Sequence, residues 1–380
     1  MVYLDNAATT FPKPECVYET VDYVQRNMGV NVGRGSYSTA LKAMKIVDET
    51  RYLMAKLLHI DDPDNVVFTP SATIAANEII FGLNWDQYKT VYVSPFEHNA
   101  IARPLESVRQ KYGIKVLQIP FEKETHAVCW DKLRTMFTRD KPDYVFVNQV
   151  SNVTGTIVPV EKIFAMSKEF GAVTIADGSQ SVGLMDINMG TDNIDYLIFA
   201  GHKNLYSSLG VGGFIAERTP KISTILAGGT GTNSLDLSMG ETSPVRFETA
   251  SPNIIALSSL NSSIKWLLET GIDKIADRKK ELTIALTDNL RNLGCSLYRP
   301  SGNLEHTSVV SFNVDGYTAA EVGSILDKDF DIAVRTGFHC APYIHDLLDT
   351  RDCGGTIRAS VGYFNTKEDV EALISAIKEL

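Results

Sequence analysis

A carboxylate and an amine each follow a run of apolar residues in the middle of this sequence. Asp177 comes directly after residues 172–176 (Ala-Val-Thr-Ile-Ala), and Lys203 comes shortly after residues 194–199 (Ile-Asp-Tyr-Leu-Ile-Phe). Both runs are typical of buried parallel strands, and ligands bind at the carboxyl ends of such strands. Pyridoxal phosphate requires an acid beside its ring nitrogen and a lysine amine for a Schiff base. The two residues therefore predict a site for this cofactor.

Each of these residues also has a plainer interpretation. Asp177 could cap a helix after the strand, and Lys203 could be a solvated lysine in a loop. The pair favours cofactor chemistry because the two roles complete one another. The acid keeps the ring nitrogen protonated, so that the ring accepts electrons, and burial lowers the pKa of the lysine amine. His202, beside Lys203, could contact the cofactor phosphate.

Three further strand ends carry polar residues that such a site could use. Residues 69–73 (Thr-Pro-Ser-Ala-Thr) open a helix whose free N–H groups could bind phosphate, although capping by Ser71 or Thr73 would give the same pattern. His98 could stack on a planar ring, or it could be a surface or capping histidine. Asn152 could bind a ring hydroxyl or a carboxylate, or it could simply belong to a turn.

A cysteine near the C-terminal end of the sequence could act as a nucleophile. Cys340 lies in residues 335–341 (Arg-Thr-Gly-Phe-His-Cys-Ala), and the cationic neighbours Arg335 and His339 would favour a thiolate. Gly337 and Pro342 indicate a loop, from which a thiol can reach a substrate. The alternative is a buried structural cysteine.

Arg358 stands within an apolar run that is typical of a strand. Burial of a guanidinium is costly unless the group is paired. A substrate carboxylate could supply a bidentate partner. The alternative is an internal salt bridge with an Asp or Glu.

The size and composition of the chain limit its class. With 380 residues, two domains are expected, and a net charge of −10 argues against nucleic acid or an anionic membrane as the main partner. We find no apolar stretch of the ~18 residues that a membrane helix needs, and no secretory signal at the N-terminus. The five cysteines are scattered without a Cys-x-x-Cys motif, which predicts no metal site and favours a reducing cytoplasm.

The pattern of elements predicts an α/β fold with a mostly parallel seven-stranded sheet and a smaller α+β C-terminal domain. The expected strands of the sheet are 66–69, 90–94, 115–119, 143–147, 172–176, 194–199 and 212–216, with helices at 73–82, 100–112 and 160–170. Residues 217–253 are expected to form an extended, functional loop. A long helical stretch, 254–294, broken near Gly271, precedes strands at 307–314, 332–335 and 356–361 and helices at 318–326 and 366–380.

We expect two domains from this pattern. Residues 15–253 would form the large cofactor-binding domain. Residues 1–14 and 254–380 would form the small domain, which carries the Cys340 loop.

In combination, these motifs resemble the cysteine desulfurases of the class V aminotransferase group. The resemblance begins at residues 3–10 (Tyr-Leu-Asp-Asn-Ala-Ala-Thr-Thr) and extends to residues 357–360 (Ile-Arg-Ala-Ser). Residues 335–341 are similar to the subgroup that includes selenocysteine lyase-like enzymes. The resemblance implies the pyridoxal-phosphate-dependent transferase fold type I.

The resemblance also implies a role for each matching residue. Lys203 would bond the cofactor, Asp177 would pair with the ring nitrogen, Gln180 with the ring oxygen, and His98 would stack on the ring. Catalytic residues would be Lys203, Cys340 and His98. Cofactor-binding residues would be Ser71, Ala72, Thr73, His98, Asn152, Asp177, Gln180, His202, Lys203 and Ser251, and substrate-binding residues would be Asn6, Asn152, Arg335 and Arg358.

Such enzymes are homodimers, in which residues 246–252 would reach the phosphate bound by the other subunit. The sequence departs from the family at several positions. Ala200 replaces a usual Ser or Thr, Ala250 replaces a usual Gly before Ser251, Gly33 and Tyr37 replace histidines common in the subgroup, and Phe338 replaces a histidine.

The resemblance implies that L-cysteine is converted to L-alanine and that its sulfur passes to Cys340 as a persulfide. A sulfur-acceptor protein would follow, as in iron–sulfur cluster assembly, tRNA thiolation or cofactor synthesis. One alternative is another pyridoxal phosphate enzyme, such as a selenocysteine lyase, a cysteine-sulfoxide lyase or an isomerase. The other is a scaffold protein of this fold that has no desulfurase activity.

Overall fold

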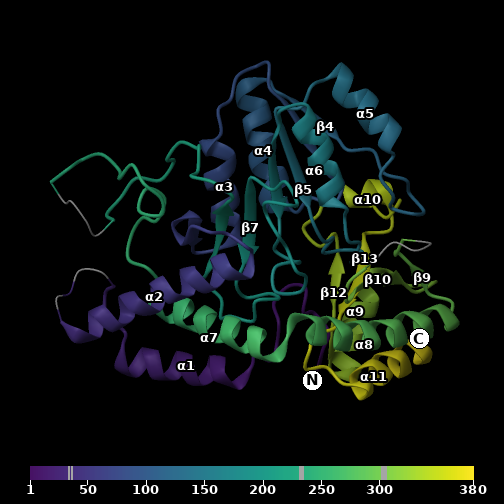
Figure 1. Ribbon diagram of the computed structural model, residues 1–380. Coiled ribbons are helices and arrows are strands. Elements are labelled where there is room, and N and C mark those ends of the chain that lie inside the picture. Colours follow the sequence, from purple (N-terminus) through teal and green to yellow (C-terminus); the bar gives the residue numbers. More distant parts are fainter. Residues whose placement is uncertain (33–34, 36, 231–234, 301–305) are drawn as a thin grey trace.

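The computed structural model describes residues 1–32, 35, 37–230, 235–300 and 306–380, so Gly33 lies outside the described residues (Figure 1). A seven-stranded sheet occupies the first two thirds of the chain, in the order β2-β8-β7-β6-β5-β3-β4. Its strands are β2 (Val66–Thr69), β3 (Thr90–Val93), β4 (Lys115–Gln118), β5 (Tyr144–Asn148), β6 (Val173–Asp177), β7 (Tyr196–Ala200) and β8 (Gly212–Ala216). The expected mostly parallel sheet is confirmed, since only β8 runs antiparallel to its neighbours.

Helices cover both faces of this sheet, which explains why its central strands are apolar on both sides. On one face lie α3 (Ala72–Gly82) and α4 (Asn99–Tyr112). On the other lie α2 (Ser38–Leu57), α5 (Trp130–Arg139) and α6 (Val160–Glu169). Gly212 lets α3 begin close to β8, because a Cβ there would lie 2.6 Å from the backbone nitrogen of Ala72.

Two long helices connect the sheet to the rest of the chain. The break expected near Gly271 separates α7 (Ile254–Thr270) from α8 (Ile272–Asn292), and Gly271 has a φ of +90°. Helix α7 packs against α1 (Glu15–Asn27) and α2, neither of which was expected from the sequence. Figure 1 shows these three helices side by side below the sheet.

The C-terminal part of the chain forms a second, smaller layer around its own apolar core. Its four-stranded sheet has the order β12-β13-β10-β9. The elements are β9 (Ser296–Leu297), β10 (Val309–Asn313), α9 (Ala319–Phe330), β12 (Arg335–Gly337), α10 (Ile344–Leu347), β13 (Thr356–Ser360) and α11 (Lys367–Glu379). The N-terminal strand β1 (Val2–Tyr3) joins this part by pairing with β11 (Ile332–Ala333).

The expected division of the chain at residue 253 stays a prediction. Residues of α7, such as Leu260 and Ile264, belong to the same core cluster as α2 and the large sheet, whereas Leu282 of α8 belongs to the C-terminal core.

A short 3₁₀ helix (Pro63–Asn65) precedes β2. The described parts of residues 217–253 contain no helix or strand, and part of this segment projects from the body of the molecule in Figure 1. Within the ranges described, none of the helices has the length and apolar character needed to cross a bilayer.

Candidate active site

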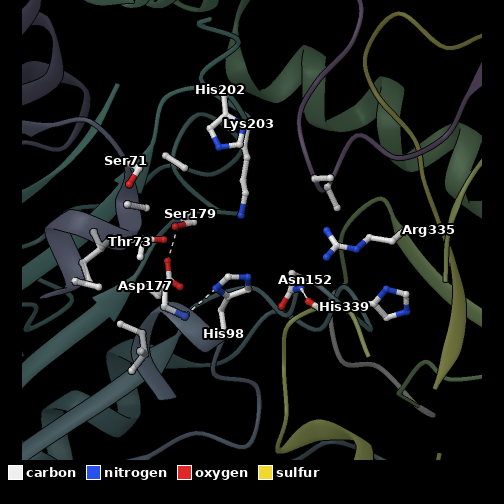
Figure 2. A pocket seen from close by; sticks show the side chains of 18 of the residues that line it. Ser71, Thr73, His98, Asn152, Asp177, Ser179, His202, Lys203, Arg335 and His339 are labelled. Carbon is white, nitrogen blue, oxygen red and sulfur yellow. Dashed lines mark hydrogen bonds between the residues drawn. The ribbon is translucent and has the colours of Figure 1, made fainter. Parts of the chain in front are cut away.

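A pocket opens at the carboxyl ends of the large sheet, where the two parts of the chain meet (Figure 2). Ten of the residues predicted from the sequence line it together: Ser71, Ala72, Thr73, His98, Asn152, Asp177, His202, Lys203, Arg335 and Arg358. They come from the ends of β2, β3, β5, β6 and β7 and from the strands β12 and β13 of the smaller sheet. The topology therefore gathers side chains that are as much as 287 positions apart, from Ser71 to Arg358.

Asp177 is the last residue of β6, and its side chain is buried in the pocket wall. Its Oδ1 accepts a hydrogen bond of 2.9 Å from the backbone N–H of Ser179, so the carboxylate also shapes the turn after the strand. Figure 2 shows the carboxylate between Ser179 and the ring of His98. A buried carboxylate in this position can pair with a positively charged ring nitrogen.

Lys203 projects into the pocket from the loop after β7 (Figure 2). Burial lowers the pKa of its amine to about 8, and the nearby Arg358 and Arg335 act in the same direction, while Asp177 opposes them. A lysine with this pKa holds a far larger fraction of free amine near neutral pH than a solvated lysine. The solvated alternative considered from the sequence does not describe this side chain.

The loop before Lys203 is held by the N-terminal segment. The carbonyl of His202 accepts hydrogen bonds from the backbone N–H of Thr10 at 3.1 Å, from the hydroxyl of Thr9 at 3.0 Å and from Nζ of Lys13 at 2.8 Å. Several donors on one carbonyl oxygen fix the position of the peptide that carries Lys203.

His98 and Ser71 both make the capping contacts that the sequence also allowed. Nδ1 of His98 accepts from the backbone N–H of Ala100 at 3.0 Å at the start of α4, and Oγ of Ser71 accepts from Ile74 at 3.3 Å at the start of α3. Burial, followed by the charge of Lys203, lowers the pKa of His98 to about 4, so its ring is neutral at pH 7. Capping leaves both side chains in the pocket lining.

Arg358 forms the internal salt bridge that was the alternative interpretation of this residue. Its Nη2 donates to Oδ1 of Asp5 at 2.5 Å, and its Nη1 donates to the carbonyl oxygen of Asn152 at 2.9 Å. The arginine side chain is 1% exposed. Its Nε and the Oδ1 of Asn152 are buried and have no hydrogen-bond partner among the described residues.

Cys340 lies beside the pocket, in an adjoining groove that shares Arg335 and His339 with it. Nη2 of Arg335 donates to Sγ of Cys340 at 3.1 Å. His339 does not provide the second positive charge expected from the sequence, because burial and the nearby arginines lower its pKa far below neutral. Both His339 (φ 48°) and Cys340 (φ 57°) have left-handed backbone conformations, which are strained for residues other than glycine.

Besides Cys340, three predicted site residues lie outside the pocket lining. Gln180 is buried and donates to the carbonyl of Ala7 at 2.7 Å. Asn6 is buried and donates to the carbonyl of Ser360 at 3.0 Å. Ser251 lies in a separate groove on the projecting segment, where its hydroxyl accepts from Asn31.

Comparisons with known proteins show the family of this chain. The sequence profile of the family Aminotransferase class-V matches residues 2–373. A probable cysteine desulfurase from Pyrococcus abyssi is 30% identical over 387 residues, an alignment that covers 100% of this chain and 94% of the relative. This chain is a member of the cysteine desulfurase family. The family recognised from the sequence motifs is thereby confirmed.

Solved desulfurase structures have the same fold. The apo cysteine desulfurase from Thermococcus onnurineus superposes with a TM-score of 0.92 at 29% identity, covering 100% of this chain and 94% of that one. A cysteine desulfurase from Escherichia coli gives a TM-score of 0.87 at 27% identity, with the same coverage. These matches confirm the fold type I architecture, and the class V desulfurase family depends on pyridoxal phosphate.

The pocket of this desulfurase family member fits that cofactor. It offers a buried carboxylate (Asp177), a buried amine of lowered pKa (Lys203) and the first N–H groups of α3, which suit a phosphate. Nδ1 of His202 is buried without a hydrogen-bond partner in the described part of the chain, as is Oδ1 of Asn152. A bound polar ligand would supply the missing partners.

Sequence reasoning missed several residues that line the desulfurase pocket. Ala7, Ala8 and Ser179 contribute backbone and small side chains to its wall, and Asp5 neutralises Arg358. Ser179 could have been found, because it follows Asp177 at the end of the same strand. Asp5 gave no local signal, since its partner lies at the opposite end of the sequence.

Proposed function

We propose that this protein converts L-cysteine to L-alanine and receives the sulfur on Cys340, so that L-cysteine plus the Cys340 thiol gives L-alanine plus the Cys340 persulfide. The observation that carries this proposal is the position of Cys340, whose Sγ lies 3.1 Å from Arg335 at the edge of the pocket that holds Asp177 and Lys203. A thiol there is beside the substrate pocket and faces a groove.

Pyridoxal phosphate would be held by the residues that fit it. Asp177 would pair with the ring nitrogen, Gln180 would contact the ring oxygen, and His98 would stack on the ring. Ser71, Ala72, Thr73 and His202 would hold the phosphate. When bound, the cofactor supplies an electron sink for the pair of electrons left on the substrate Cα when its proton departs.

The protein's own residues then carry the proton and the sulfur. Arg358, Asn152 and Arg335 would bind the substrate carboxylate, which orients the Cα–H bond toward Lys203. The free amine of Lys203 would take this proton. The thiolate of Cys340 would attack the substrate sulfur, forming an S–S bond, while the C–S bond breaks and its electron pair remains on Cβ. Protonation of Cβ, and return of the proton from Lys203 to Cα, complete alanine.

We further propose a cytoplasmic homodimer that passes its persulfide sulfur to an acceptor protein. All five cysteines are free, which supports a reducing compartment. The projecting segment carries the almost fully exposed Leu235 and Leu237, and such apolar exposure on a loop is what a contact with a second subunit would cover. Ser251 would then contact the cofactor bound by the partner subunit.

We also propose that residues 15–253 form the large domain, and that residues 1–14 and 254–380 form the small domain.

The experiment is a reaction of the purified holoenzyme with L-cysteine and a reductant, in which alanine and sulfide are both measured. Cys340→Ala should lose alanine and sulfide formation while it keeps the visible absorbance of the bound cofactor. Cys353→Ala is the matched control, because Cys353 is exposed and does not line either groove of the site. Sulfide formation that persists in Cys340→Ala would disprove the role of this thiol. Release of selenide from selenocysteine, without sulfide from cysteine, would move the assignment to a selenocysteine lyase.

A further inference from the structure

The loop that carries Cys340 is closed by a buried histidine that the proposed reaction does not use. His345 lies in α10, five residues after Cys340, and is 1% exposed. Its Nε2 lies 3.1 Å from the carbonyl oxygen of Phe338, and its Nδ1 lies 2.7 Å from the hydroxyl oxygen of Thr350. Both ring nitrogens are therefore engaged.

These contacts define the tautomer of the ring. A carbonyl oxygen only accepts hydrogen bonds, so Nε2 of His345 carries the proton and donates it to Phe338. In the neutral ring Nδ1 is then an acceptor, and the hydroxyl of Thr350 donates to it. Burial lowers the pKa of His345, which keeps the ring neutral. Thr350, fully buried, thus holds His345 as a donor toward Phe338.

Phe338 immediately precedes the strained pair His339 and Cys340. Its carbonyl also accepts from the backbone N–H of Ala341 at 3.0 Å, so the His345 and Ala341 donors meet on one oxygen across the turn. The rings of Phe338 and His345 pack in a T-shaped arrangement, with ring centroids 5.1 Å apart and an interplanar angle of 81°. Two left-handed residues other than glycine persist only where surrounding contacts hold them.

The strained turn also sets where the thiol lies. The carbonyl of His339 accepts from Asn152 at 2.8 Å, and the carbonyl of Cys340 accepts from the backbone N–H of Asn99 at 2.7 Å. These contacts attach the turn to the loop after β5 and to the start of α4, whereas His345 contacts it from α10. Without the contact from His345, the carbonyl of Phe338 loses one of its two donors.

We propose that His345 is a positioning residue for sulfur transfer: through the carbonyl of Phe338, it holds the Cys340 turn in the conformation that places Sγ beside Arg335. This inference rests on the proposed role of Cys340 as sulfur acceptor. His345 does not line the pocket that holds Asp177 and Lys203, so it would act through the backbone of the turn.

A pair of substitutions in the holoenzyme tests the proposal. His345→Gln places an amide donor about as far along the side chain as Nε2, whereas the donor of His345→Asn ends short of Phe338. We expect His345→Asn to slow persulfide formation on Cys340 about tenfold, because one buried hydrogen bond is lost. For the same reason, deuterium exchange of the backbone amides of residues 338–342 should become faster by about the same factor. His345→Gln should stay within about threefold of the wild type in both measurements.

Two controls separate positioning from general damage. The visible absorbance of the cofactor and the exchange of the Cα proton of L-alanine with D₂O, which needs Lys203 but no thiol, should be unchanged in both variants. If His345→Asn does not fold, Thr350→Val compared with Thr350→Ser tests the same arrangement of the ring, because only the valine variant removes the donor to Nδ1 that keeps the proton on Nε2. Thr350→Val should then behave as described for His345→Asn.

The inference is overturned if His345→Asn transfers sulfur at the wild-type rate. It is also overturned if His345→Gln and His345→Asn are equally impaired in sulfur transfer and show equally fast exchange of the backbone amides of residues 338–342. Failure of the proposed function gives a different result. In that case the wild type forms no persulfide on Cys340. The rates of backbone amide exchange in the two His345 variants still show whether this residue holds the turn.

Discussion

Arg358 and Asp5 form an ion pair of 2.5 Å between residues that are 353 positions apart in the sequence. The guanidinium is almost fully buried, so the carboxylate of Asp5 is what allows a positive charge to remain at the wall of the pocket. Arg358 uses Nη1 and Nη2 for protein contacts and keeps Nε without a described partner. The substrate carboxylate would therefore meet an arginine whose position is already set.

Removal of this counter-charge should weaken the fold. We expect Asp5→Asn to reduce the free energy of unfolding by about 2 kcal/mol, because it leaves a buried guanidinium without a charged partner. Asp22→Asn, which breaks the exposed pair of Asp22 with Arg26, should cost about 0.5 kcal/mol or less. Urea titrations of both variants check this expectation, and equal losses would contradict it.

The lowered pKa of Lys203 should be visible when the cofactor-free protein takes up pyridoxal phosphate. Because the pKa of this amine is about 8, the rate of uptake should rise about tenfold per pH unit below pH 8 and then level off. A solvated lysine analogue such as N-acetyl-lysine should keep rising toward pH 10. The growth of visible absorbance measures both, and a protein profile that still climbs above pH 9 would be inconsistent with a buried amine.

Glu97 should make the fold less stable as the pH rises. The side chain is fully buried, and burial raises its pKa to about 8 from the usual 4.5. Between these values the unfolded chain releases the proton and the folded chain keeps it, so stability falls with increasing pH. Relative to Glu97→Gln, which stays neutral, the wild type should lose on the order of 4 kcal/mol between pH 4.5 and pH 8. If the difference in free energy of unfolding between the wild type and Glu97→Gln does not change with pH, Glu97 is ionised in the folded protein.

Lys13 should support the segment that carries Lys203. Its Nζ donates to the carbonyl of His202 at 2.8 Å and to the hydroxyl of Thr10 at 2.6 Å. We expect Lys13→Met to weaken cofactor binding about fivefold, as the loss of one such hydrogen bond would. Equilibrium dialysis of pyridoxal phosphate measures the change, with Lys132→Met on the exposed side of α5 as control. An unchanged dissociation constant would show that the threonine contacts suffice.

Much of the cofactor site was predictable because its residues follow recognisable strands. Asp177 and Lys203 come after β-branched apolar runs, and a parallel sheet brings the ends of such runs to one edge. The antiparallel direction of β8 was not predictable, since Gly212–Ala216 is as apolar as its neighbours. Helices α1 and α2 were missed, and they acquire their partner, α7, only about 200 residues later in the sequence.

The contacts between distant residues also escaped sequence reasoning. Asn6 matched a motif and was expected to meet substrate, yet its amide binds the backbone at Ser360. His339 was expected to carry a positive charge beside Cys340, but burial lowers its pKa and makes the ring neutral. In both cases the surroundings that decide the chemistry come from another part of the chain, so no local pattern could reveal them.

The attachment of the N-terminal segment has a consequence for the order of folding. Asp5 bridges to Ser360 and β1 pairs with β11, so these residues meet partners that lie more than 300 positions later in the sequence. Contacts of such long sequence separation form slowly and late. The buried charge pair of Arg358 and Asp5 at the pocket wall is therefore expected to be among the last parts of the fold to form.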